Sequence, residues 1–189
     1  MTENRSISAV ALGANLKFHK NPPQLTLGNA IEALASGGVV IRAVSRFFAT
    51  PCFPAGAGPD YVNAAILVEA ADTPQALLRR LHVVEAQFGR ERVQRWGMRT
   101  LDLDLVLAGD RVEPDLGVFR SWNALEPQEQ ARNAPDRLIL PHPRLQDRAF
   151  VLVPLADIAP DWRHPVLGQK VSEMLAALPD QERAAVVPI

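Results

Sequence analysis

Two aspartates, Asp102 and Asp104, are the side chains of this sequence whose spacing is best suited to chemistry. They lie in a segment where leucine alternates with polar residues, a pattern that predicts a β-strand with both carboxylates on one face. Carboxylates at positions i and i+2 of a strand are about 7 Å apart at their Cα atoms, so both can reach hard cations held between them. The opposite face of this predicted strand carries Leu101, Leu103, Leu105 and Leu107.

Arginines cluster immediately before this acidic strand. Because neighbouring carboxylates repel each other, magnesium or arginine is expected to compensate their charge. Arginine forms paired hydrogen bonds with phosphate oxygens, and carboxylates bind the Mg2+ that accompanies a polyphosphate. The pattern therefore predicts a site for magnesium and a polyphosphate. The alternative is a solvated strand face with a surface salt-bridge network, which contributes little to stability. The four arginines are Arg90, Arg92, Arg95 and Arg99.

Six segments are expected to position these groups. Hydrophobic periodicity and turn residues predict strands at 7–12, 39–48, 61–69 and 101–107, and helices at about 24–35 and 74–88. Their order is strand, helix, strand, strand, helix, strand, which is typical of a ferredoxin-like α+β fold with helices packed on one face of an antiparallel sheet. Residues 13–15 are expected to form a turn after the first strand.

The remaining segments are expected to be loops and C-terminal helices. Residues 50–59 hold three prolines and two glycines, which predicts a loop able to act as a lid. Residues 113–137 lack periodicity and are predicted to form a long surface insertion with one helical turn near 126–132. An apolar strand is expected over 138–144, and a last helix over 171–178. We expect one domain covering residues 1–189.

Composition limits the classes of function. The chain has 189 residues, 48% of them hydrophobic, and a formal net charge of -1, so it can bury a full core but lacks the basic excess of a general nucleic-acid or membrane-surface binder. Cys52 is the only cysteine, which excludes a disulfide within the chain and a cysteine-based zinc site. A cytoplasmic monomer that binds small molecules is the expectation.

Two further residues need a choice between functional and structural roles. His142 lies between Pro141 and Pro143, which fix its backbone at the end of the predicted strand, so it is a candidate for a phosphate contact, although a lone histidine is more often structural. Glu85 lies one position from the apolar stripe of the predicted helix 74–88, and periodicity alone indicates a residue bordering the core.

The sequence lacks the phosphate-loop, dinucleotide-binding, paired-cysteine and nucleophile-elbow motifs, so the common nucleotide folds are not indicated. It resembles instead the 6-hydroxymethyl-7,8-dihydropterin pyrophosphokinase family of folate synthesis, which is ferredoxin-like. The resemblance covers residues from about 7 to 161. It is carried by the segments 12–16, 50–51, 60–65, 89–92, 95–104 and 141–145, together with Arg148 and Phe150.

This resemblance implies an ATP-dependent diphosphotransferase that moves a pyrophosphoryl group from ATP to the hydroxymethyl oxygen of the pterin and releases AMP. It implies two Mg2+ ions held by Asp102 and Asp104, and it assigns catalysis to Arg90, Arg99 and Asp104. Along ATP it places Glu85, Arg92, Trp96, Arg99, Leu105, His142 and Arg148. Around the pterin it places Thr50, Phe53, Tyr61, Asn63, Trp96 and Phe150.

Departures from the family pattern are Met98 where proline is usual, Ala14 where serine is common, and the length of the 113–137 insertion. One alternative function is a ferredoxin-like RNA-binding module that uses residues 90–99 and aromatic platforms, and it predicts salt-sensitive binding to single strands. Another is a pterin-binding relative without catalysis. The acidic strand face disfavours the first alternative, and the presence of both aspartates disfavours the second.

Overall fold

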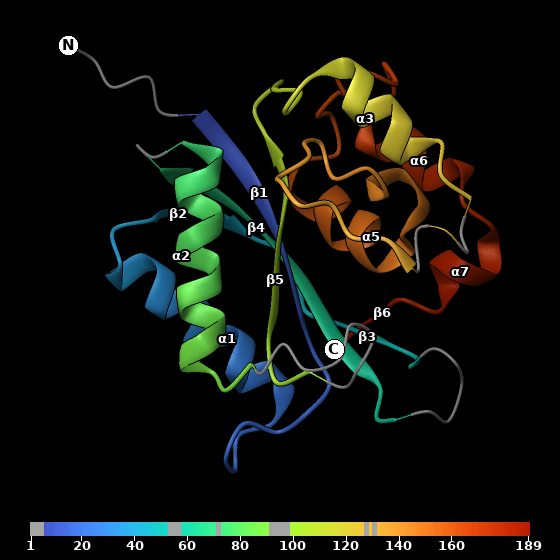
Figure 1. Ribbon diagram of the computed structural model, residues 1–189. Helices are drawn as coiled ribbons and strands as arrows, with labels where there is room; N and C mark the ends of the chain where they lie inside the picture. Colours follow the sequence, from blue (N-terminus) through green and yellow to red (C-terminus); the bar gives the residue numbers. More distant parts are fainter. Residues whose placement is uncertain (1–5, 53–57, 71–72, 91–98, 127–128, 130–131) are drawn as a thin grey trace.

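Six strands form one antiparallel sheet in the computed structural model (Figure 1). The structure describes residues 6–52, 58–70, 73–90, 99–126, 129 and 132–189. The strands are β1 (Ser6–Ala14), β2 (Val40–Val44), β3 (Phe48–Thr50), β4 (Tyr61–Ala70), β5 (Asp102–Ala108) and β6 (Val187–Pro188). The helices are α1 (Pro23–Ser36), α2 (Pro74–Gln87), α3 (Leu116–Asn123), the short 3-10 helix η1 (Leu145–Asp147), α5 (Ala149–Ile158), α6 (Val171–Ala177) and α7 (Asp180–Ala184).

The strand order is β5-β1-β4-β3-β6, with β2 also paired to β4, and it confirms the predicted ferredoxin-like sheet. The segment expected as one strand over 39–48 is instead divided into β2 and β3. Ser45 lies at the division, where its N–H donates to the carbonyl of Ala65 and its hydroxyl oxygen accepts from the N–H of Ala65, both at 2.9 Å. A side-chain oxygen therefore takes the place of a main-chain acceptor, and the regular ladder stops there.

Helices α1 and α2 cover one face of the sheet (Figure 1). Each has proline in its first turn, and the hydroxyl oxygen of Thr73 caps α2 by accepting from the N–H of Ala76 at 3.3 Å. Both helices were predicted at these positions and are confirmed. The core on this side includes Leu12, Leu27, Leu34, Ile66, Leu81 and Leu103.

Helices α5 and α6 pack on the opposite face of the sheet, where Ala9 and Ala65 meet Leu152 and Leu155. Figure 1 shows α3, α5, α6 and α7 together on this side. The two helices of the ferredoxin-like core thus lie on one face, as predicted, and the C-terminal helices cover the other. The described C-terminal helices leave the Asp102 end of β5 uncovered on this second face, which is where the predicted carboxylates project.

A β-bulge changes the faces of β5. Ala9 pairs with Leu107 and Val10 pairs with Leu105, so Val106 is an extra residue without a partner on β1. As a result Leu107 lies in the core under α5, whereas Leu105 lies in the core under α1 and α2. The prediction that Leu107 shares a face with Leu105 was wrong because regular alternation ends at the bulge. The bulge carbonyl of Val106 accepts from the N–H of His142 at 2.8 Å.

The insertion is more regular than predicted. Its first part forms α3, which Asp115 caps by accepting from the N–H of Val118 at 2.9 Å. Phe119 of this helix is fully buried and lies against His164, with ring centroids 5.5 Å apart. Glu129 and Arg132 are helical, in line with the expected turn. The strand expected over 138–144 makes only one bridge, between Leu140 and Glu113.

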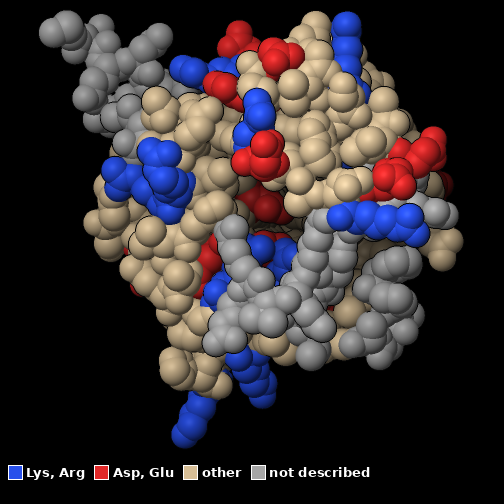
Figure 2. Space-filling view, in the orientation of Figure 1, with Lys and Arg blue, Asp and Glu red and all other residues tan. Residues whose placement is uncertain are grey.

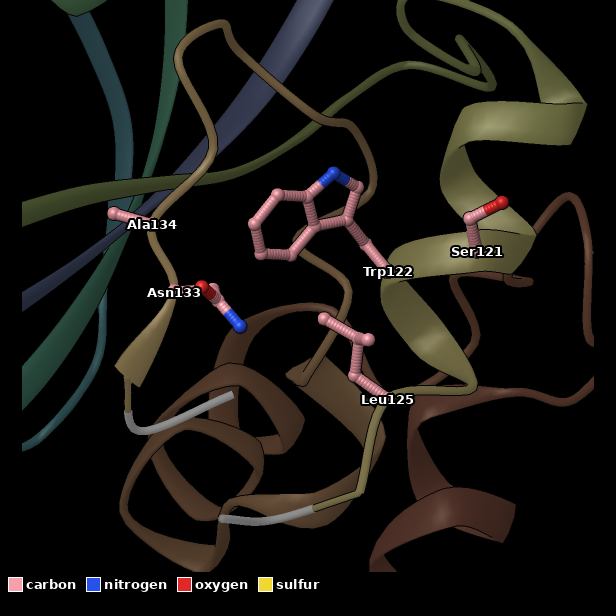
Figure 3. Close-up of a pocket in the computed structure, with 5 residues that line it drawn as sticks. All are labelled: Ser121, Trp122, Leu125, Asn133 and Ala134. Atoms are coloured by element: carbon pink, nitrogen blue, oxygen red, sulfur yellow. The ribbon is translucent and has the colours of Figure 1, made fainter. Parts of the chain in front are cut away.

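A cavity of about 330 Å3 lies between α3 and the returning chain of the insertion (Figure 3). Trp122 projects into it from α3, opposite Asn133 and Ala134. A polar link also joins the insertion to the histidine segment, because the side-chain amide of Asn123 donates to the carbonyl of Pro143 at 3.0 Å. The insertion is thus attached directly to the segment that carries His142.

His164 fastens the C-terminal part to the insertion. Its Nδ1 accepts from the N–H groups of Val166 and Leu167, each at 3.2 Å, so its single proton resides on Nε2. Burial lowers the pKa of His164 to about 4, and the ring therefore stays neutral near pH 7.

In the described part of the chain, no helix is long and apolar enough to cross a membrane.

Candidate active site

The two predicted carboxylates project from the open face of β5. Asp102 pairs with Gly13 of β1, and Asp104 pairs with Ala11, so the neighbouring strand adds little side-chain bulk beside them. Both aspartates are partly buried. Leu105 points to the other face, where it is 3% exposed in the core. Strand alternation therefore separates its side chain from the carboxylates, and its expected contact with ATP stays a prediction.

Asp102 is held between two arginines. Its Oδ1 lies 2.7 Å from a guanidinium nitrogen of Arg90, and its Oδ2 accepts from Arg99. Burial and the negative charge of Asp104 raise the pKa of Asp102, and the two arginines oppose this rise. The Oδ1 atom is shielded from solvent, and among the described residues it has no donor in hydrogen-bond geometry. The site thus holds two neighbouring carboxylates whose mutual repulsion a bound cation would reduce.

Glu85 has a different position from the one expected. It is 1% exposed and lies in α2, where its carboxylate accepts from Arg90 and from the N–H of Leu103, the latter at 2.7 Å. The residue therefore joins α2, β5 and the guanidinium of Arg90. Its carboxylate is engaged within the protein by Arg90 and Leu103, and its expected place along ATP stays a prediction.

Asn15 positions the second arginine, a role that the sequence did not reveal. The side-chain oxygen of Asn15 accepts from the N–H of Arg99 at 2.8 Å, and the N–H of Asn15 donates to the carbonyl of Arg99 at 3.0 Å. Its side-chain nitrogen donates to the carbonyl of Pro59 at 3.2 Å. A residue predicted only to end a strand therefore ties together three segments. The preceding Gly13 and Ala14, expected in the same turn, belong to β1.

A polar slot lies beside the carboxylates, at the start of β4. The side-chain nitrogen of Asn63 donates to the hydroxyl of Thr50 at 2.6 Å, and Asn63 is 5% exposed. A Cβ atom at position 13 would lie 3.0 Å from the side-chain oxygen of Asn63, so Gly13 leaves the room that this amide needs. Burial raises the pKa of Tyr61, with Arg99 opposing the rise. Tyr61 thus lies close to the arginine that contacts Asp102.

Phe150 and Arg148 lie at the start of α5, the helix packed over β4. Phe150 is 41% exposed, an unusual position for a phenylalanine, and the guanidinium of Arg148 lies 5.7 Å from the centre of its ring. Burial lowers the pKa of Arg148, whereas the charge of Asp104 opposes this change. Arg148 and Asp104 therefore belong to the same electrostatic cluster, and the exposed ring of Phe150 is available for stacking.

His142 presents a hydrogen-bond donor toward this cluster. Its Nδ1 accepts from the N–H of Arg144 at 3.1 Å, so a neutral ring carries its proton on Nε2. Burial and the positive charges of Arg148 and Arg144 lower the pKa of His142 to about 3. The ring is therefore a neutral donor at physiological pH, suited to an anionic oxygen, and not a general base that titrates near neutrality.

The donor set fits magnesium bound together with a polyphosphate. Mg2+ usually takes only one or two protein carboxylates, and water and phosphate oxygens complete its octahedron. The described residues include no cluster of three or more histidine, cysteine or acidic side chains able to hold a metal by themselves. The pair of Asp102 and Asp104 matches the smaller requirement of Mg2+, and the repulsion between the two carboxylates agrees with it.

Figure 2 shows a hollow in the middle of one face of the molecule, with acidic and basic side chains next to each other inside it. A cavity of about 690 Å3 is lined by Asn15, Asp60 and Tyr61 and extends toward Pro23 at the start of α1. Three predicted site residues, Phe53, Arg92 and Trp96, lie outside the described residues, as do Arg95 and Met98.

Comparisons with known proteins agree with this geometry. The model of the family described as 7,8-dihydro-6-hydroxymethylpterin-pyrophosphokinase (HPPK) matches residues 9–160. A 2-amino-4-hydroxy-6-hydroxymethyldihydropteridine pyrophosphokinase of Synechocystis sp. is 37% identical over 89% of this chain and 74% of its own length. The protein of the same name from Pseudomonas aeruginosa is 38% identical over 90% of both chains.

Solved structures share the fold. The wild-type HPPK-DHPS of Plasmodium falciparum has a TM-score of 0.61 and 15% identity, covering 92% of this chain and 44% of that one. The same protein with pterin and p-hydroxybenzoate has a TM-score of 0.63 and 15% identity, covering 92% and 43%. This chain therefore spans less than half the length of those solved chains, and at this identity the likeness establishes the fold alone.

Proposed function

This chain belongs to the 7,8-dihydro-6-hydroxymethylpterin-pyrophosphokinase family, and from this premise we propose how its own residues carry out the reaction. The enzyme is a transferase that moves a pyrophosphoryl group to the hydroxymethyl group of 6-hydroxymethyl-7,8-dihydropterin in folate biosynthesis. The donor is ATP and the second product is AMP. The observation that carries this proposal is the placement of Asp102 against Arg90 and Arg99, with Asp104 two residues further along the same face of β5.

The pterin lies in the slot beside the carboxylates. Tyr61 and Phe150 stack on the two faces of its flat bicyclic ring, and Asn63, oriented by Thr50, reads its amide edge. Asn63 is suited to this task because Thr50 accepts from its nitrogen and thereby fixes which end of the amide faces Gly13. The hydroxymethyl group then points toward the aspartates.

The nucleotide phosphates lie over the carboxylates, among the basic groups of the site. His142 donates from Nε2, and Arg148 supplies positive charge from the α5 side. Arg90 and Arg99 are the catalytic cations, because fixed guanidinium groups neutralise charge that develops on the transferring phosphoryl oxygens. Glu85 and Asn15 hold these two arginines in place before the substrates bind.

Asp102 and Asp104 would hold two Mg2+ ions between the protein and the phosphate chain. When bound, magnesium neutralises phosphate charge and lowers the pKa of the attacking alcohol. The work of the protein is then to hold the hydroxymethyl oxygen in line with the β-phosphorus, and Asp104 helps to accept the proton of the alcohol.

We further propose that the protein is a cytoplasmic monomer and that its residues 1–189 form one domain.

The decisive experiment follows the nucleotide product. The protein is incubated with Mg2+, ATP and 6-hydroxymethyl-7,8-dihydropterin, and the products are separated by chromatography. AMP and the pterin diphosphate are expected in equal amounts, because transfer of two phosphoryl groups at once leaves AMP. ADP as the product would contradict the proposal, and so would a lack of reaction from folded protein that binds both substrates.

Replacing Tyr61 with alanine is expected to weaken pterin binding much more than ATP binding. Loss of one stacking face removes roughly 1–3 kcal/mol, which corresponds to roughly 5- to 150-fold in the dissociation constant of the pterin. Titration calorimetry with each substrate alone measures the two affinities, and Tyr61→Phe is the control because it keeps the ring. Equal losses of pterin and ATP affinity in Tyr61→Ala would contradict stacking at this position.

A further inference from the structure

Arg144 lies beside the nucleotide site, although neither the sequence pattern nor the resemblance assigned it a role. It follows His142 and Pro143 and is the residue from which η1 begins. Its main-chain N–H donates to Nδ1 of His142 at 3.1 Å, so the imidazole ring is held against the backbone of Arg144. The side chain of Arg144 is partly buried, and its position next to His142 places it at the edge of the proposed phosphate site.

The guanidinium of Arg144 lacks a compensating group. Its Nε is shielded from solvent and has no acceptor among the residues that the structure describes. In that same part of the chain, no carboxylate lies within ion-pair distance of Arg144, whereas many other arginines are paired, including Arg111, Arg132, Arg137 and Arg183. Four more pairs are Arg42 with Glu69, Arg46 with Asp157, Arg90 with Glu85 and Arg99 with Asp102. A partly buried cation without a partner costs free energy, so its environment is complete only when an anion binds.

Arg148 is in the same position. No ion pair to a carboxylate joins it within the described ranges. Burial lowers its pKa, the charge of Asp104 opposes this change, and the positive charge of Arg144 adds to it. The charges of both arginines also lower the pKa of His142. Two guanidinium groups and the Nε2–H of His142 therefore meet in one region that already has an excess of hydrogen-bond donors. A ligand with several anionic oxygens is the complement of such a cluster.

We propose that Arg144 is a further phosphate-binding residue, which contacts the phosphate chain of the nucleotide together with His142 and Arg148. This inference rests on the proposed function, because it takes the polyphosphate of that reaction as the ligand. Arg144 therefore contributes to the affinity for ATP and for inorganic tripolyphosphate, because both carry the phosphate chain. It does not take part in recognition of the pterin. Its guanidinium acts as a fork with two donors, which lysine cannot reproduce.

The test measures the affinity of Arg144→Gln for two probes by titration calorimetry with Mg2+ and without pterin. The probes are ATP and inorganic tripolyphosphate, which lacks the base and sugar. Both dissociation constants are expected to rise roughly 10- to 100-fold, as for loss of one or two hydrogen bonds to a charged group, while pterin affinity stays unchanged. The matched control is Arg111→Gln, which removes the same charge at the far end of β5, where the side chain is 53% exposed.

Unchanged affinity of Arg144→Gln for tripolyphosphate would overturn the inference, and so would an equal loss of pterin affinity. If that variant does not fold, Arg144→Lys takes its place, and a wild-type affinity of this variant for tripolyphosphate would also overturn it, because the fork is then unnecessary. The wild-type protein is assayed for AMP in parallel. Formation of AMP by wild type, combined with unchanged binding in the variants, refutes the role of Arg144 while leaving the proposed function intact.

Discussion

Replacing Asp102 or Asp104 with asparagine is expected to reduce AMP formation by roughly 1000-fold or more while the protein stays folded. Asparagine has nearly the same shape but lacks the negative charge that holds magnesium against the phosphates. The fold should tolerate Asp102→Asn because burial and Asp104 already raise the pKa of Asp102, which means that the folded protein disfavours its charged form. Initial rates of AMP release, together with thermal melting, measure the two effects.

A matched control separates this effect from a general change of charge. Asp110 lies in the turn after β5 and is exposed, so Asp110→Asn removes one carboxylate from the other end of the same strand. It should leave AMP formation within about twofold of the wild type. Calorimetry of ATP binding with and without Mg2+ adds a second measurement, in which the dependence on Mg2+ should be lost. Turnover at the wild-type rate by either Asp102→Asn or Asp104→Asn would remove the basis of the mechanism.

Replacing Glu85 with alanine is expected to lower the free energy of unfolding by about 3–5 kcal/mol. The change leaves the guanidinium of Arg90 without its buried partner and the N–H of Leu103 without its acceptor. Urea denaturation followed by circular dichroism measures this loss. AMP formation should fall as well, because Arg90 loses the contact that positions it.

Glu85→Gln and Glu32→Ala are the comparisons for this experiment. Glutamine can still accept from Leu103 but no longer compensates the charge of Arg90, so an intermediate loss of stability is expected. Glu32 is exposed on α1, and its replacement should change the unfolding free energy by less than about 0.5 kcal/mol. A loss below 1 kcal/mol in Glu85→Ala would show that the buried carboxylate does not hold these segments together.

Local patterns predicted the parts of the fold that depend on neighbours in sequence. Alternation of leucine with polar residues placed Asp102 and Asp104 on one face of a strand. Apolar residues spaced three and four positions apart predicted the helices α1 and α2. The helix α3 was missed, although Asp115 caps it, because its eight residues bury chiefly Phe119 and give little periodicity. The bulge at Val106 was also missed, since one extra residue in a hydrophobic run leaves no visible break in sequence.

The contacts that complete the site join residues far apart in sequence, and this is why the sequence did not reveal them. Asn15 and Arg99 are separated by 84 positions, and the hydrogen bond between them exists only because β1 and β5 are adjacent. Glu85 was predicted to border the core, because hydrophobic periodicity indicates only which side chains are buried. It does not indicate which groups a buried carboxylate contacts. Tyr61, Asn63 and His142 were assigned by family resemblance, and their roles stay predictions.

The bulge in β5 has a consequence for how the two halves of the site are aligned. The carbonyl of Val106, which the bulge frees from β1, holds the backbone of His142, while Asp104 lies two residues earlier on the same strand. The separation between imidazole and carboxylates is therefore set by a single short run of backbone. A deletion of one residue in that run would shift the imidazole relative to both acidic groups, even if every side chain of the hydrophobic core found an equivalent place.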